Sequence, residues 1–198
     1  MSKRVKRGDC VLLVVDVQEK LIGTIAERAE ILENIRALVT TAETLDIPIL
    51  MTEQEKLGDT IVELDRASLH FPKFRKLSFS CCEDRRFPGK LSELGRRTVI
   101  VCGIEAHICV LQTTLDLLER GYCVVVPKDA TSSYAAVDRE TAIERMSAAE
   151  ATITTTEALI YELTERAGTE EFEKILEIVK KRRKTIAEMG SSDTATCG

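Results

Sequence analysis

Residues 10–17 read CVLLVVDV, and this run constrains the fold of the chain more than any other stretch. Its Val and Leu residues follow one another without polar alternation, which is typical of a strand covered on both faces in a parallel sheet. Asp16 interrupts the run near its carboxyl end. It fits a turn or capping residue as well as it fits a carboxylate that projects into a ligand site at the carboxyl edge of the sheet.

Strand and helix patterns then alternate along the chain. Residues 26–45 carry an apolar helical stripe, and residues 47–51 form a second short apolar run, so the opening unit is β-α-β with a right-handed crossover. Further strands are expected at residues 77–80, 98–102, 122–126 and 151–154. Further helices are expected at residues 88–94, 107–120, 138–150 (capped by Asp138), 156–163 and after Thr169. The alternation predicts a three-layer α/β/α fold with a mainly parallel sheet.

The chain of 198 residues is long enough for one domain with a substantial core. We expect this domain to span residues 8–185, with flexible tails at residues 1–7 and 186–198. A formal charge of −5 argues against a nucleic-acid surface, although the basic run at residues 180–184 leaves a local patch open. No run approaches the roughly 20 apolar residues of a membrane helix.

The seven cysteines indicate a reducing compartment. Their number is odd, no CxxC pair occurs, and several lie inside apolar runs. Residues 11–15 are too short for the core of a signal peptide. We therefore expect a cytoplasmic protein, with an organellar location left open.

Cys109 lies in the stretch VIVCGIEAHICVLQT at residues 99–113, where a short apolar strand is followed by a turn and a helical pattern. A helix N-terminus favours negative charge, and therefore favours the thiolate, which is the nucleophilic form of cysteine. A buried structural cysteine is the alternative interpretation.

Several segments together resemble the isochorismatase-like cysteine hydrolases. The resemblance rests on LLVVDVQ at residues 12–18, KLSFS at 76–80 and CGIEAHICVLQTTLDLLERG at 102–121. TEQ at residues 52–54 and VDRETAIERM at 137–146 are similar to the isochorismatase-domain-containing proteins in particular. The similarity keeps the same order over residues 8–180.

The resemblance implies a catalytic triad of Asp16, Lys76 and Cys109, with Lys73 as the alternative lysine. In this triad Lys76 would lower the pKa of the thiol, and Asp16 would take its proton and later help to activate water. Thiolate attack on a carbonyl carbon, loss of an amine and hydrolysis of the thioester would follow. The expected substrate is a small molecule with an amide-type C–N bond.

The resemblance also implies features of the fold around the nucleophile. The family's sheet has six strands in the order 3-2-1-4-5-6. A non-proline cis peptide would fall at the bond Ile104–Glu105, and backbone amides near Ile108 and Cys109 would form an oxyanion hole at the start of the helix. Gln18 and His107 are possible substrate contacts.

Other expectations come from departures from the family pattern. The stretch TEQEKLGD at residues 52–59 holds no histidine, and none occurs before His70, so we expect no zinc site and no other cofactor. No arginine cluster suits a dianionic substrate, so the family name should not be taken as the activity. We expect a homo-oligomer that covers part of the site. A scaffold without turnover and an RNA-associated role, a label that some relatives carry, are the alternatives.

Overall fold

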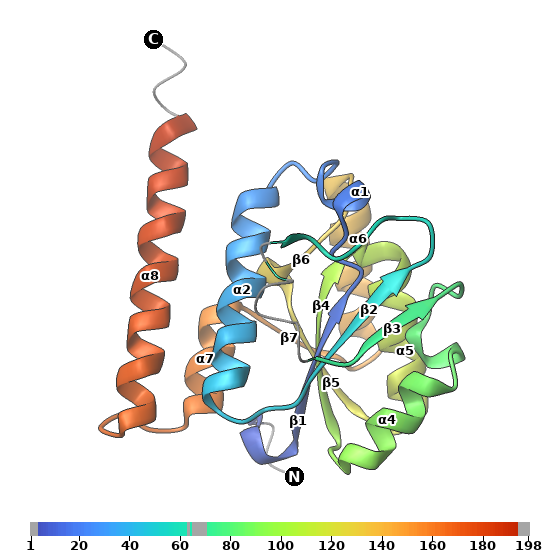
Figure 1. The fold of residues 1–198 in the computed structure, drawn as a ribbon, viewed down its shortest axis with the longest axis horizontal. Coiled ribbons are helices and arrows are strands. Elements are labelled where there is room, and N and C mark those ends of the chain that lie inside the picture. Colours follow the sequence, from blue (N-terminus) through green and yellow to red (C-terminus); the bar gives the residue numbers. More distant parts are fainter. Residues whose placement is uncertain (1–3, 63, 65–70, 194–198) are drawn as a thin grey trace.

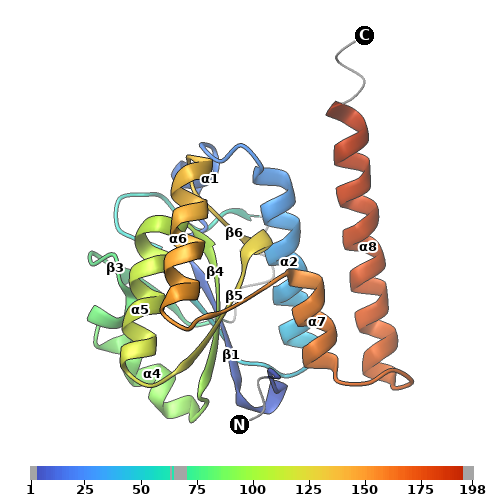
Figure 2. The same cartoon turned by 180° about the vertical axis from the view of Figure 1, so that it is seen from behind.

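One parallel sheet covered by helices on both faces makes up the body of the molecule (Figures 1 and 2). It is seen in a computed structural model that describes residues 4–62, 64 and 71–193. The strands follow the order β3-β2-β1-β4-β5-β7, and a short β6 pairs with β4. The predicted three-layer fold and six-strand order are confirmed, with β6 as a seventh, two-residue strand that is not among the expected strands.

The strands are β1 (Cys10–Val15), β2 (Ile49–Gln54), β3 (Lys73–Lys76), β4 (Thr98–Ile104), β5 (Cys123–Pro127), β6 (Thr131–Ser132) and β7 (Thr152–Thr154). The helices are α1 (Glu19–Ile22), α2 (Arg28–Thr44), α4 (Arg86–Leu94), α5 (Leu111–Glu119), α6 (Ala136–Ala148), α7 (Thr156–Thr164) and α8 (Glu170–Asp193). Shorter turns of helix are η1 (Arg7–Asp9), η2 (Cys81–Glu83), η4 (Lys128–Ala130) and the π-helical turn η3 (Ala106–Val110).

Strand β1 lies in the middle of the sheet and is buried along its whole length. Leu12 and Val14 pack into the core under α2, α7 and α8, whereas Leu13 and Val15 pack into the core under α4, α5 and α6. Alternate side chains of one strand therefore enter two separate cores, which explains why this run is apolar without alternation.

Gly103 in β4 lies opposite Val15 at the end of β1. Its φ is +130°, and a Cβ atom here would collide with the Val15 carbonyl oxygen. Only glycine permits this approach of two backbones. The approach brings the carboxyl ends of β1 and β4 together, immediately before Asp16 and the turn that leads to Cys109.

Three expected elements differ from the structure. The strand expected at residues 77–80 was misplaced, because the edge strand β3 ends at Lys76, where its pairing with β2 stops. The helix expected from residue 107 begins as the π-helical turn η3 and becomes regular only at Leu111. Asp138 lies in the first turn of α6 instead of capping it, because the extended Ala135 already occupies the capping position.

Described residues near both ends of the chain lie in contacts or regular structure inside the ranges expected to be tails. Val5 is buried and its backbone N–H donates to the Glu162 carboxylate at 2.8 Å, inside the range 1–7 that we expected to be flexible. Helix α8 continues through residue 186, where the second flexible tail was expected to begin, and ends at Asp193 (Figure 1). Residues 194–198 and His70 lie outside the described residues.

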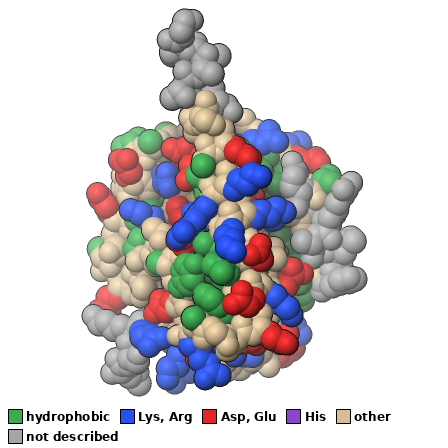
Figure 3. Space-filling model, turned by 90° about the vertical axis from the view of Figure 1, so that its left-hand side faces the viewer, with side chains coloured by type: hydrophobic (Ala, Val, Ile, Leu, Met, Phe, Trp, Pro, Cys, Tyr) green, Lys and Arg blue, Asp and Glu red, His purple; other side chains and the backbone are tan. Residues whose placement is uncertain are grey.

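The basic run at residues 180–184 lies within α8, where acidic side chains accompany the Lys and Arg side chains (Figure 3). Arg182 is buried and donates to Asn34 Oδ1 at 2.6 Å and to Asp129 Oδ2 at 3.2 Å, which fixes α8 to α2 and to η4. Lys180, Arg183 and Lys184 pair with Glu177, Glu157 and Glu188. Four of the five cations thus have carboxylate partners, so much of the positive charge of this run is balanced locally.

Candidate active site

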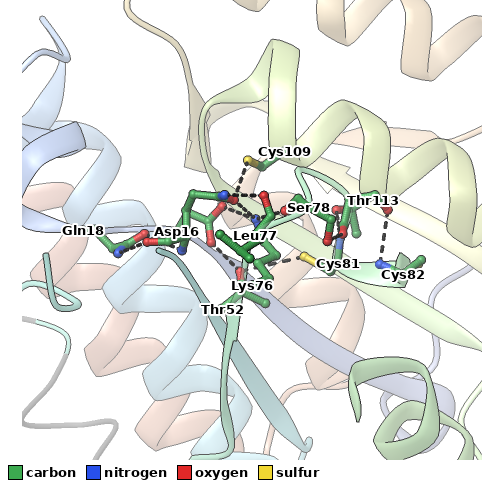
Figure 4. Close-up of polar contacts among 12 residues, drawn as sticks. Asp16, Gln18, Thr52, Lys76, Leu77, Ser78, Cys81, Cys82, Cys109 and Thr113 are labelled. Carbon is green, nitrogen blue, oxygen red and sulfur yellow. Dashed lines mark hydrogen bonds and ion pairs between the residues drawn. The ribbon is translucent and has the colours of Figure 1, made fainter. Parts of the chain in front are cut away.

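A buried ion pair forms the floor of the site at the carboxyl edge of the sheet (Figure 4). Lys76, the last residue of β3, donates from Nζ to Asp16 Oδ2 at 2.7 Å. Neither side chain is more than 1% exposed. Lys73 stands exposed at the other end of the same strand, so the structure brings Lys76 to Asp16 and leaves Lys73 away from it.

Asp16 follows β1 directly and has a φ of +50°, a left-handed conformation that Asp and Asn tolerate better than other side chains. Its second carboxylate oxygen, Oδ1, accepts a hydrogen bond of 2.7 Å from Thr52 Oγ1 in β2. Its backbone N–H donates to the Thr52 carbonyl oxygen at 3.2 Å. Both carboxylate oxygens are therefore held, and the sharp turn aims the carboxylate into the site.

Cys109 lies in η3, above the ion pair, and is 6% exposed. Its Sγ is 4.0 Å from the side-chain oxygen of Gln54, the same oxygen that accepts a 2.8 Å hydrogen bond from Lys76 Nζ. Figure 4 shows Cys109, Asp16 and Lys76 converging from three different segments of the chain.

The charges around Cys109 act on its thiol in opposite directions. Burial raises the pKa of the thiol, the Asp16 carboxylate raises it further through its charge and a hydrogen bond, and the Lys76 ammonium lowers it. The net result is a pKa well above the ordinary value, contrary to the thiolate that the sequence analysis expected. Burial outweighs the Lys76 ammonium, and Cys109 lies in a π-helical turn instead of the first turn of a regular α-helix.

Lys76 remains an ammonium ion in this site. Burial is the largest single effect and lowers its pKa, but the charge and hydrogen bond of Asp16 together with the nearby Cys81 and Cys109 raise the pKa of Lys76 above its ordinary value. The resting site is thus a neutral thiol beside an intact ion pair.

The bond Ile104–Glu105 is cis, as the resemblance implied. The Ile108 backbone N–H donates to the Glu105 carbonyl oxygen at 3.2 Å, so it would have to leave that acceptor to serve in an oxyanion hole. The Glu105 carboxylate accepts a 3.1 Å hydrogen bond from the Tyr134 backbone N–H, and His107 Nδ1 lies 2.9 Å from Ser133 Oγ. These two side chains tie η3 to the start of α6, and His107 remains partly exposed.

Gln18 is fully buried, and its amide is used within the protein. It accepts from the Gln54 backbone N–H at 2.8 Å and donates to the carbonyl oxygens of Gln54 and Gly58, at 3.0 and 2.6 Å. These contacts favour a role in positioning Gln54 over direct contact with a substrate.

Gln54, Thr52 and Cys81 are site residues that the sequence analysis did not single out. Gln54 ends β2 and pairs in register with Lys76, and the thiol of Cys81 donates to Thr52 Oγ1 at 3.8 Å. The signal for Gln54 and Thr52 is their place at the end of a strand beside β1, an argument that the sequence analysis applies to Asp16 and Cys109 and not to these two residues. Cys81 carries no such signal, because it follows the edge strand β3 by several residues.

Metal-ligating side chains do not cluster in the part of the chain that the structure describes. In residues 4–62, 64 and 71–193 no group of three His, Cys, Asp or Glu side chains is placed to hold a metal ion.

Within the same residues, no helix combines the length and the apolar character needed to cross a membrane.

Known proteins resemble this chain in sequence over most of its length. Isochorismatase domain-containing protein 2 of Homo sapiens is 38% identical over 183 residues, covering 89% of this chain and 86% of that protein. The secreted isochorismatase effector Isc1 of Phytophthora sojae is 36% identical over 182 residues, covering 88% of this chain and 86% of that protein.

A solved structure is similar to this chain in both sequence and fold. The MAR1 ribonuclease of Caenorhabditis elegans is 38% identical and superposes with a TM-score of 0.83, covering 89% of this chain and 92% of that chain. The sequence profile of the isochorismatase domain matches residues 10–158, which include Asp16, Lys76 and Cys109. On these grounds the chain belongs to the isochorismatase family.

Proposed function

We propose that this chain is a cysteine hydrolase that cleaves the C–N bond of an amide-type small molecule. The observation that carries the proposal is the convergence of Cys109 on the buried Asp16–Lys76 pair. Cys109 is the proposed nucleophile, Asp16 the general base and Lys76 the cation that favours negative charge on sulfur.

The first step follows from the raised pKa of the thiol. Asp16 takes the proton from Cys109 Sγ as sulfur attacks the carbonyl carbon of the substrate, so the thiolate need not accumulate beforehand. The tetrahedral intermediate then collapses, the C–N bond breaks, and Asp16 returns the proton to the departing amine. An acyl thioester on Cys109 remains.

The second step returns the enzyme to its starting state. Asp16 takes a proton from water, the resulting oxygen nucleophile attacks the thioester carbonyl, and the acid leaves as the proton passes back to sulfur. Lys76 stays charged throughout, because its pKa is raised. The developing oxyanion lies next to the backbone of the turn at residues 104–109, which supplies N–H donors once the Ile108 amide leaves Glu105.

We also propose that the chain forms a homo-oligomer at this edge of the sheet. Leu77 and Phe79, which follow Lys76, are 70% and 52% exposed, and Tyr134 and Val137, near His107, are 72% and 66% exposed. Large apolar side chains gathered at one edge are typical of an interface. Light scattering of the purified chain checks the assembly, and a monomer at micromolar concentration would contradict it.

The experiment for the proposed function is a screen of primary amides and cyclic imides for release of amine or ammonia. Cys109→Ala should lower turnover of any substrate found by at least about 10³-fold, since it removes the nucleophile. Cys123→Ala, a change at an exposed cysteine, is the matched control and should retain turnover. Undiminished hydrolysis by Cys109→Ala would contradict the proposal. If the chain hydrolyses none of these compounds, and if it binds a protein partner equally well as the Cys109→Ala variant, the alternative of a scaffold without turnover is favoured.

Ribonuclease activity is the second candidate, because the C. elegans relative is named a ribonuclease. In that case cleavage of RNA would persist in Cys109→Ala, and binding of RNA would weaken steeply with added salt. Binding that is absent or insensitive to salt would reject it.

The names of the relatives do not give the cellular compartment of this chain. The P. sojae protein is named a secreted effector. Our proposal of a reducing, cytoplasmic location rests on the cysteine content, and the six described cysteines are all free.

A further inference from the structure

The side-chain amide of Gln54 has its orientation set by its neighbours. Its nitrogen donates to the Leu77 carbonyl oxygen at 2.8 Å, so its oxygen points toward Lys76 and Cys109. Its backbone is held on both sides by Gln18, through the N–H at 2.8 Å and the carbonyl at 3.0 Å. Gln54 is thus fixed at both its backbone and its side chain.

Lys76 carries three N–H donors, and three acceptors meet them. Asp16 Oδ2 lies at 2.7 Å, Gln54 Oε1 at 2.8 Å and the Ser78 carbonyl oxygen at 3.3 Å. Of these three, Gln54 is an uncharged side-chain acceptor that also lies close to the sulfur, at 4.0 Å. Without it the ammonium would be drawn toward the opposite charge of Asp16 alone.

We propose that Gln54 is a positioning residue that holds the Lys76 ammonium between the Asp16 carboxylate and the Cys109 sulfur, with Gln18 as its anchor. The importance of Gln54 for turnover rests on the proposed function. Its effect on the charges around the thiol is tested without any substrate. A neutral acceptor is needed at this place, because a carboxylate there would hold the lysine and also repel the thiolate.

The titratable groups that act on the Cys109 thiol come from three other segments. They are Asp16 after β1, Lys76 at the end of β3 and Cys81 in η2. On its own turn, Glu105 and His107 are hydrogen-bonded to Tyr134 and Ser133 instead. Lys76 is the cation in this set, so its position controls how far the thiol can ionise.

The test compares Gln54→Met and Gln54→Glu with the unaltered chain. Methionine keeps the volume without an acceptor, and glutamate keeps the acceptor but adds a negative charge. The rate of Cys109 alkylation by iodoacetamide, followed on the Cys109 peptide by mass spectrometry, should fall severalfold in Gln54→Met. It should fall about tenfold or more in Gln54→Glu, because a carboxylate so close to sulfur raises the thiol pKa by about one unit or more.

Gln112→Glu is the matched control, since Gln112 is exposed in α5 and gains the same charge. Its alkylation rate should equal that of the unaltered chain. Alkylation of folded Gln54→Glu within twofold of the unaltered chain would overturn the inference, and if that variant does not fold, an unchanged rate in Gln54→Met overturns it. Failure of the proposed function has a different readout, namely turnover that survives Cys109→Ala. The failure of the inference about Gln54 and the failure of the proposed function are therefore distinguishable.

Discussion

At Cys109, two neighbouring side chains of opposite charge act against each other. The Asp16 carboxylate raises the pKa of the thiol and the Lys76 ammonium lowers it, while burial raises it most. A thiol in this balance is protonated at neutral pH and reacts when a base takes its proton. The site therefore suits a nucleophile that is activated only when substrate is in place.

Lys76→Met should lower both the reactivity of the Cys109 thiol and the stability of the fold. The buried Asp16 carboxylate would lose its partner, at a cost of about 3–5 kcal/mol in the free energy of unfolding. The pKa of Cys109 would rise further, because the cation that lowers it is gone, and alkylation at pH 8 would slow. Urea unfolding and peptide-resolved alkylation measure the two effects. Lys73→Met, an exposed change in the same strand, should stay within about 0.5 kcal/mol of the parent, and equal effects of the two substitutions would contradict this account.

Among the elements, the contact between β1 and β4 decides where the site residues end up. Gly103→Ala places a Cβ against the Val15 backbone at a φ of +130°. We expect a loss of about 3 kcal/mol in stability from overpacking and the unfavourable φ. Thermal or urea unfolding measures it. Gly89→Ala in α4, where a Cβ would meet nothing within 4 Å, should be neutral or stabilising, and a Gly103→Ala chain as stable as Gly89→Ala would contradict the packing described.

Elements with strong patterns were predictable from sequence, and those fixed by tertiary contacts were not. The unbroken apolar run of β1 reveals a strand buried on both faces, and Thr169 accepts from the Phe172 N–H as expected of a helix cap. Strand β3 (KFRK) has no apolar pattern, because its pairing with β2 at the sheet edge is what makes it a strand. Helix α8 is tied to α2 by Arg182 donating to Asn34, a contact between residues 148 positions apart that no local pattern reveals.

The site shows the same division. Asp16 and Cys109 could be inferred from strand ends, and Lys76 from the resemblance to a family. The raised pKa of the thiol could not be inferred, since it depends on how deeply η3 is packed against its neighbours. Gln54 was missed because a glutamine gives no signal of its own until its partners are known.

For the whole molecule, buried thiols should set the alkaline limit of stability. Burial raises the pKa of Cys102 from 9.0 to about 12, and that of Cys81 to about 11. Above pH 9 the unfolded chain releases these protons and the folded chain keeps them, so the free energy of unfolding falls as pH rises. Each thiol contributes about 1.4 kcal/mol per pH unit between its unfolded and folded pKa values.

Urea unfolding at pH 8 to 11 checks this dependence. Stability should be nearly constant up to pH 8.5 and fall steeply above 9. Cys102→Ala should lose about 1.4 kcal/mol less per pH unit than the parent over pH 9.5 to 11. Parallel curves of the free energy of unfolding against pH for the parent and Cys102→Ala would contradict this prediction. They would mean that folding leaves the pKa of Cys102 unchanged.

The central claim is that Asp16 acts on the Cys109 thiol directly, and the alkylation rate of Cys109 in Asp16→Asn tests it. Asparagine keeps the shape and tolerates the φ of +50° at this position. Since the carboxylate raises the thiol pKa, its removal should lower the pKa that is read from the pH profile of alkylation by iodoacetamide, by about one unit. A thiol pKa in Asp16→Asn that is unchanged or higher would contradict the account.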